Sequence, residues 1–169
     1  MDIRFNETGK TTVAELDNCF LKFKNFAGAE GMYNNAGDRS FQLNLTQEEY
    51  EILGEKGFPV KAKEVDGNVY YSMNVKLAWK ERDGSVYGPD IYLDANGKRT
   101  KIGPDEAGRL DKLSLTNVNM DVRLWHWTKR ANEGNSCWLN AMEATSRTTN
   151  RFAGRIIDPM DAVDEDPFD

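Results

Sequence analysis

The alternation of apolar and polar side chains over residues 69 to 80 constrains the fold of this chain more than any other feature. Successive side chains of a β-strand point to opposite sides, so the pattern predicts a long strand with one buried face. Asp66-Gly67 just before it is typical of a two-residue hairpin turn, and it predicts antiparallel pairing with residues 60 to 64. The apolar positions are Val69, Tyr71, Met73, Val75, Leu77 and Trp79.

Further strands are predicted by similar patterns elsewhere in the chain. Thr46 followed by Glu49 forms a capping box and predicts the one α-helix, which should end at Gly57. Many strands, hairpin turns and a single short helix predict a mainly β fold, a small antiparallel barrel or sandwich. The expected strands cover residues 18 to 27, 41 to 45, 91 to 93, 98 to 102, 115 to 127 and a last segment starting near Cys137.

Charge is distributed unevenly along the sequence. The net charge is -6, and the last twelve residues hold six carboxylates without a lysine or arginine. The remaining body therefore carries 22 acidic and 22 basic residues, and its charge must be considered neutral. Residues 123 to 155 are nevertheless basic, with six arginines and lysines against Glu133 and Glu143. A neutral body with segregated charges can carry a basic groove.

Signatures of catalysis and of metal binding were sought and not found in the sequence. The single histidine, His126, lies within an expected strand, and no cluster of His, Cys and carboxylates has the spacing of a metal site. We therefore expect no enzyme activity, no catalytic residue, no metal and no cofactor. Cys19 and Cys137 are expected to be buried thiols, and the lack of a long apolar segment or signal peptide indicates a cytoplasmic protein without membrane contact.

Aromatic and cationic side chains share faces of two of the expected strands. A protein that binds a single nucleic-acid strand needs cations near the phosphates and flat rings on which bases stack. The same rings could instead pack in the core or form a homodimer interface, since the strand from Leu115 has apolar residues on both faces. The candidate DNA-binding residues are Tyr70, Lys76, Lys80, Arg123, Trp125, Trp127, Lys129 and Arg130.

The chain ends on a proline and a phenylalanine inside a block of carboxylates. Such a segment has too little apolar surface to fold alone, so we expect a disordered tail that a partner protein orders on binding. It resembles the acidic tip of bacterial single-stranded-DNA-binding proteins and their bacteriophage counterparts. One departure is that Asp169 follows the phenylalanine. The candidate partner-binding residues are Asp164, Glu165, Asp166, Pro167, Phe168 and Asp169.

The whole chain resembles a bacteriophage-type single-stranded-DNA-binding protein. This resemblance implies an OB-fold-like domain over residues 1 to 157 and an acidic interaction tail over residues 158 to 169. It also implies binding of single-stranded DNA without sequence preference in replication, recombination or repair. The tail would then recruit other replication or recombination proteins and compete with DNA. An alternative from another class is a small viral inhibitor of a host nucleic-acid enzyme, whose acidic tail imitates DNA.

Overall fold

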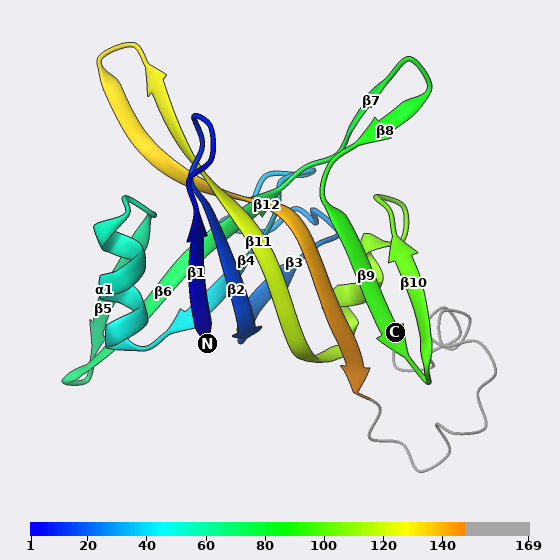
Figure 1. Ribbon diagram of the computed structural model, residues 1–169, viewed down its shortest axis with the longest axis horizontal. Coiled ribbons are helices and arrows are strands. Elements are labelled where there is room, and N and C mark those ends of the chain that lie inside the picture. The colour runs from blue at the N-terminus through cyan, green and yellow to red at the C-terminus, as the bar shows by residue number, and fades with distance from the viewer. Residues whose placement is uncertain (148–169) are drawn as a thin grey trace.

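The computed structural model describes residues 1–147, which form a strongly curved ten-stranded β-sheet, a separate two-stranded sheet of β7 and β8, and few helices (Figure 1). The one α-helix is α1 (Gln47–Glu55), and η1 (Ala107–Lys112) is a short 3-10 helix. In this part of the chain, neither helix has the length and the apolar composition needed to cross a bilayer. The strands are β1 (Asp2–Asn6), β2 (Val13–Cys19), β3 (Leu21–Asn25), β4 (Arg39–Leu45), β5 (Val60–Val65), β6 (Asn68–Leu77), β7 (Lys80–Arg82), β8 (Ser85–Tyr87), β9 (Asp90–Ala95), β10 (Lys98–Ile102), β11 (Ser114–Lys129) and β12 (Asn132–Arg147).

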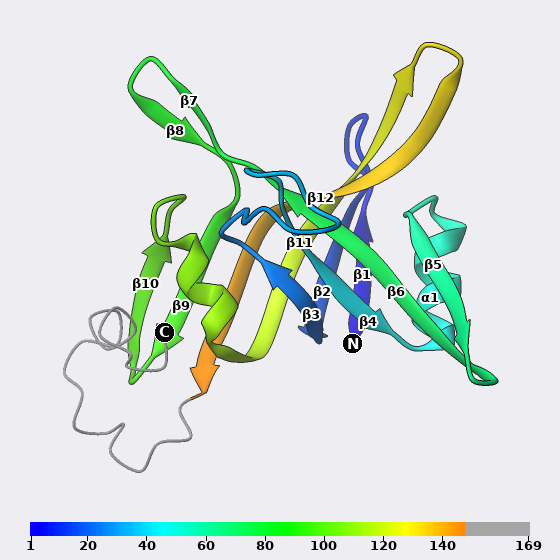
Figure 2. The ribbon, with the colours of Figure 1, turned by 180° about the vertical axis from the view of Figure 1, so that it is seen from behind.

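The long hairpin of β11 and β12 forms the centre of the sheet. Its strands are 16 residues each, and the strand order across the main path is β1-β2-β11-β12-β6-β4-β3. The other edge of β12 is shared by β6 and β9, which pair with successive parts of it in parallel. The second view shows this long hairpin passing behind β6, with β12 running beside β9 (Figure 2). All other strand pairs are antiparallel.

A single apolar core lies on the inner side of the curved sheet. The alternation predicted for residues 69 to 80 is confirmed over residues 71 to 77, where Met73, Val75 and Leu77 of β6 are almost completely buried, but Val69 is 49% exposed. They pack with Phe41 and Leu43 of the neighbouring strand β4 and with apolar side chains of β2, β9, β11 and β12. The intervening residues of β6 face away from the core, so the sheet presents a separate polar side to solvent.

Turn and cap residues explain where these elements begin and end. Asp66-Gly67, Asp83-Gly84 and Asn96-Gly97 all have positive φ at both positions, as a type I′ hairpin turn requires. The Thr46 side chain accepts from the backbone N–H of Glu49, whose carboxylate accepts from the Thr46 N–H in return. The predicted capping box and the single α-helix are therefore confirmed.

The predicted fold class is confirmed as mainly β with one short α-helix. Among residues 1–147 the strand path is open and ends at β1 and β3, and the pairings of β12 with β6 and with β9 are parallel. The sheet departs in these details from an antiparallel barrel. Cys19 and Cys137 are buried free thiols, as expected. The acidic tail and the domain boundary at residue 158 lie outside the described residues.

Two predictions about individual strands were wrong. The segment from Asn18 to Ala27 is not one strand, because the backbone of Asn18 has φ 61° and β2 ends at Cys19 before β3 begins at Leu21. Likewise, the strand predicted from Val69 does not continue to Lys80. Strand β6 ends at Leu77, and Lys80 is the first residue of the separate hairpin β7–β8. The pairing of β6 with β4 ends at Leu77, so nothing extends the strand beyond it.

Candidate nucleic-acid interface

Two hairpins project from the top of the body in the view of Figure 1, the tip of β11–β12 at the left and β7–β8 at the right. Between their bases lies a hollow of about 480 Å3, here called the central groove. Its lining contains two cations and three aromatic rings and no carboxylate. The lining residues are Ala78, Lys80, Tyr87, Gly88, Arg123, Trp125 and Trp138.

Arg123 and Trp138 form the floor of the central groove. They are direct cross-strand partners on β11 and β12, and the Arg123 guanidinium carbon lies 5.8 Å from the centre of the Trp138 ring. Nη1 of Arg123 also donates to Oδ1 of Asn140 at 2.7 Å. A guanidinium held in this way keeps donors available for a phosphate and leaves the tryptophan as a flat surface beside it.

The hairpin β7–β8 forms one wall of the central groove. Lys80 and Tyr87 are directly paired, and Arg82 lies two residues from Lys80, so all three side chains share one face of this ribbon. Lys80 and Tyr87 line the groove, and Tyr87 is 58% exposed. All six residues of the ribbon are exposed, so no core contact orders this hairpin. Its groove face is basic and aromatic.

Trp79 anchors the base of this hairpin. Its indole N–H donates to the carbonyl of Pro89 at 3.2 Å, and the Arg39 guanidinium carbon lies 5.0 Å from its ring centre. The ring lies directly over Gly88, where a Cβ atom would come within 2.3 Å of it. Trp79 therefore fixes the angle at which β7–β8 leaves the body.

The central groove continues past Trp138 towards β6. Two smaller hollows share Trp138 and Ala78 with it, one containing Arg123 and Asn140 and the other containing Arg39 and Lys76. Lys76 is the β6 residue paired with Trp138, so the two side chains are neighbours on the outer side of the sheet. The hollow at Lys76 also contains Asp38, the one carboxylate in the lining of the three hollows.

Beyond Lys76 the outer side of the sheet stays polar and cationic. We call it the polar face, and cross-strand pairing defines its members. None of these positions carries an aspartate or glutamate, and four carry lysine. They are Lys22 on β3, Ser40, Gln42 and Asn44 on β4, Lys61 and Lys63 on β5, and Tyr70, Ser72, Asn74 and Lys76 on β6.

The middle of β11, where it pairs with β2, is acidic. Glu15 on β2 pairs directly with Asp121, and Asp17 lies two residues further on the same face. Burial, followed by repulsion from Glu15 and Asp17, raises the pKa of Asp121. Arg4 contacts Glu15 and Asp17 at 3.3 and 2.9 Å. Asp121 and Arg123 share one face of β11, so the carboxylates around Asp121 border the central groove. They would repel phosphates there.

The structure brings some of the predicted DNA-binding residues together and separates others. Lys80, Arg123 and Trp125 line the central groove, and Lys76 lines the hollow next to it. Trp127, Lys129 and Arg130 belong to the protruding tip of β11–β12 and are not part of the lining. Tyr70 lies at the other end of β6, in a different hollow.

The sequence analysis missed Trp138, Tyr87 and Arg82. The pair Asp83-Gly84 is a hairpin-turn signal, and it could have predicted the ribbon that carries Arg82 and Tyr87. Trp138 could not be found from its own strand, because only the register of β12 against β11 and β6 places it between Arg123 and Lys76. His126 faces away from the groove, and its Nδ1 lies 2.8 Å from Oδ1 of Asn135.

Comparison with known proteins identifies a matching family and similar solved structures. Residues 8–148 match the family described as "Putative phage ssDNA-binding domain". The single-stranded DNA-binding protein from bacteriophage Enc34 has a similar structure, with 11% identity, a TM-score of 0.51 and coverage of 96% of this chain and 99% of that chain. The same phage protein in complex with ssDNA gives 10% identity and a TM-score of 0.52 over 86% of this chain and 96% of that chain. At this identity the similarity concerns the fold. No curated protein sequence matches the chain.

Proposed function

The chain belongs to the family of putative phage ssDNA-binding domains, and from this premise we propose that it binds single-stranded DNA through the central groove, without reading the base sequence. A family of binding domains also agrees with the prediction that the chain is not an enzyme. The observation that carries the proposal is the lining of the groove, which combines three aromatic rings with two cations and contains no carboxylate. This combination suits unpaired bases on a phosphate backbone.

Roles follow from the chemistry of each side chain. Trp125, Trp138 and Tyr87 provide surfaces for stacking, which every base can use because every base has a flat face. Stacking is worth about 1 to 3 kcal/mol per base, so a few such rings and phosphate contacts give useful affinity. The phosphate contacts come from Lys76, Lys80, Arg82 and Arg123. Trp127, Lys129 and Arg130 extend the same contacts along the tip of β11–β12.

The acidic tail has a regulatory role in this proposal. Residues 158 to 169 form a separate segment that recruits replication or recombination proteins through Asp164 to Asp169 and competes with DNA for the body. The support is electrostatic, since this segment carries the whole net charge of the chain and the proposed DNA site is cationic. The protein would act in the host cytoplasm, where phage DNA is replicated.

Titration of tryptophan fluorescence with oligo-dT tests the proposal. Because Trp125 and Trp138 line the groove, binding should quench the emission, and the affinity should fall with added salt as counterions are released. Deleting residues 158 to 169 should leave the affinity unchanged or raise it. A chain that shows no quenching at low salt does not bind through this groove, and tight binding to a basic host protein would then favour the inhibitor alternative.

A further inference from the structure

We propose that a second site, formed by Phe20, Asn44 and Tyr70 at the far end of the polar face, takes one unpaired base of the same DNA strand. This inference rests on the proposed function, because it extends the path of the strand beyond the central groove. The three residues line a hollow of about 390 Å3 that shares no residue with the groove. It is therefore a separate contact, with its own measurable effect.

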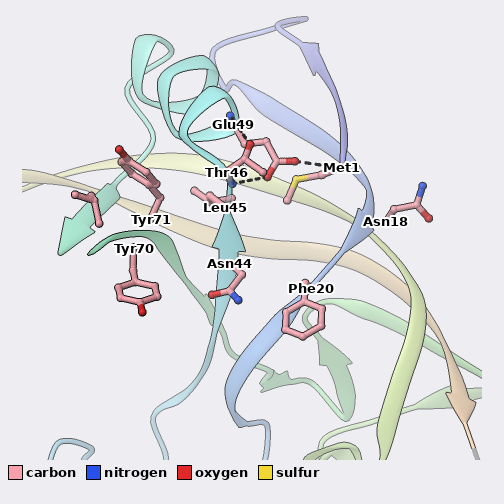
Figure 3. Close-up of a pocket in the computed structure, with 10 residues that line it drawn as sticks. Met1, Asn18, Phe20, Asn44, Leu45, Thr46, Glu49, Tyr70 and Tyr71 are labelled. Atoms are coloured by element: carbon pink, nitrogen blue, oxygen red, sulfur yellow. Dashed lines mark hydrogen bonds and ion pairs between the residues drawn. The ribbon is translucent and has the colours of Figure 1, made fainter. Parts of the chain in front are cut away.

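Two exposed rings flank one amide at this site. Tyr70 on β6, Asn44 on β4 and Phe20 at the β2–β3 connection point in the same direction, whereas Tyr71 points to the other side (Figure 3). Phe20 is 63% exposed and Tyr70 is 54% exposed. Neither ring is in a stacking contact with another ring of residues 1–147. Each ring is therefore free of other rings and exposed enough for a base to stack on it.

Asn44 supplies a polar contact between the rings. Its backbone N–H donates to the Phe20 carbonyl at 2.9 Å, which fixes the position of the two residues relative to each other. Within the described residues its side-chain amide has no hydrogen-bond partner. An amide offers both donors and an acceptor, so it can pair with the edge of any base.

The one carboxylate in this hollow does not oppose DNA. Glu49 belongs to the capping box of α1, and its Oε1 accepts from the Thr46 N–H at 2.8 Å. Its Oε2 lies 3.1 Å from the N-terminal ammonium of Met1 (Figure 3). The carboxylate is therefore neutralised and largely buried.

Lysines border the site on both sides. Lys63 is the direct cross-strand partner of Tyr70, and Lys61 is the partner of Ser72, two residues further along β6. On the other side, Lys22 pairs with Gln42, two residues from Asn44 on β4. A phosphate on either side of a base stacked at Tyr70 would thus meet a cation.

The polar face connects this site to the central groove. Tyr70 and Lys76 are six residues apart on the same face of β6, or about 20 Å at the rise of a β-strand. Lys76 is paired with Trp138, where the groove begins. An oligonucleotide must therefore exceed a minimum length to use both sites. A short one should occupy the groove alone, because the groove lining contains Lys80 and Arg123 whereas the second hollow is lined by no lysine or arginine.

Anisotropy titrations with labelled oligo-dT of about 4 and about 16 nucleotides, the range of a single OB-fold site, test this length dependence. In the full chain, the Phe20→Ala/Tyr70→Ala variant should bind the long oligonucleotide about 5- to 100-fold more weakly and the short one unchanged. Tyr70→Trp should keep the affinity and add quenching that only the long oligonucleotide produces. Thermal unfolding verifies that the variants fold, as expected for exposed side chains.

The outcomes separate this inference from the proposed function. If Trp138→Ala weakens binding of the long oligonucleotide but Phe20→Ala/Tyr70→Ala does not, the second site is refuted and the groove remains. If neither variant weakens binding, the proposed function itself fails. A Lys61→Ala/Lys63→Ala variant should also affect only the long oligonucleotide, and an equal loss with the short one would contradict a separate site. Conversion of a wild-type dimer to a monomer by the aromatic variant, seen by sedimentation, would instead make the rings a self-association surface.

Discussion

The Arg123 guanidinium carbon lies 5.8 Å from the centre of the Trp138 ring, and the two residues are direct partners across β11 and β12. This pair joins the two kinds of contact that a single DNA strand needs, a cation and a stacking surface, on one rigid element. Trp138 lines three hollows of the outer surface, and Arg123 lines two of them. We expect the pair to dominate binding.

Replacing Trp138 should weaken DNA binding more than replacing Trp127. Trp138→Ala removes the ring shared by three hollows and should lower the affinity for oligo-dT about 5- to 100-fold. Trp127 lies outside the groove over Gly134, so Trp127→Ala should have a smaller effect. Trp138→Phe, which keeps a ring, is the matched control and should retain most of the affinity. If Trp138→Ala and Trp127→Ala lower the affinity equally, Trp138 is not the main stacking residue of the central groove.

The role of Arg123 as a phosphate contact can be measured from the salt dependence of binding. Arg123→Met should reduce the slope of log K against log salt by about 0.7, the contribution of one phosphate on a single strand. Lys101→Met removes one charge from β10, where Lys101 contacts Asp90 at 3.2 Å, and should leave the slope unchanged. An unchanged slope for Arg123→Met would remove Arg123 from the phosphate contacts.

Gly88 should tolerate no side chain. A Cβ atom there would lie 2.3 Å from Cδ1 of Trp79 and 2.9 Å from the Ala78 carbonyl oxygen. Gly88→Ala should therefore displace the ring and lower the free energy of unfolding by about 1 to 3 kcal/mol, measured by urea denaturation. Gly31→Ala, where a Cβ would meet nothing within 4 Å, is the control. A stable Gly88→Ala variant would show that Trp79 does not hold the base of β7–β8.

The cluster around Arg99 should make stability depend on pH. The Arg99 hydrogen bond to Asp94 lowers the pKa of this carboxyl from its ordinary value of 3.8. Hydrogen bonds from Asn119 and then from Arg99 lower the pKa of Glu143 from 4.5. For carboxyls with lowered pKa, the stabilisation is present above the ordinary pKa and is lost as pH falls through the lowered one.

It follows that Arg99→Met should be less stable than the wild type at pH 7, and that this difference should narrow below about pH 4. Thermal unfolding of the two proteins from pH 7 to pH 3 measures it. Taking the difference cancels the titration of groups that the substitution does not touch. If the stability difference between the two proteins stays constant from pH 7 to pH 3, the ion pairs of Arg99 with Asp94 and Glu143 do not contribute to stability.

Local patterns in the sequence predicted most individual elements correctly. The capping box of Thr46 and Glu49, the Asp66-Gly67 and Asn96-Gly97 turns and the buried face of β6 were all predicted because each depends on neighbouring residues only. The errors arose where the backbone departs from its local pattern. Asn18 has φ 61° and β2 ends one residue later, at Cys19, and the loss of strand partners ends β6 before Trp79.

The candidate site was predicted only in part, for a similar reason. Alternation placed Arg123 and Trp125 on one face of a strand and Lys76 on one face of another, and both placements agree with the structure. It could not show that Lys76 lies near Arg123, because the distance between strands depends on their pairing order. Nor could it find Trp138, whose importance comes from its partners on β11 and β6.

By itself, the sequence determined the fold class, the single helix, the neutral body and the acidic end, because these depend on composition and on periodicities of a few residues. The tertiary structure alone decided which rings and cations share a surface. The parallel pairing of β12 with β6 brings Trp138 to Lys76, and the β7–β8 hairpin brings Tyr87 and Lys80 to Trp125. The physical reason is that contacts between distant segments are set by strand order and register, which the sheet acquires only on folding.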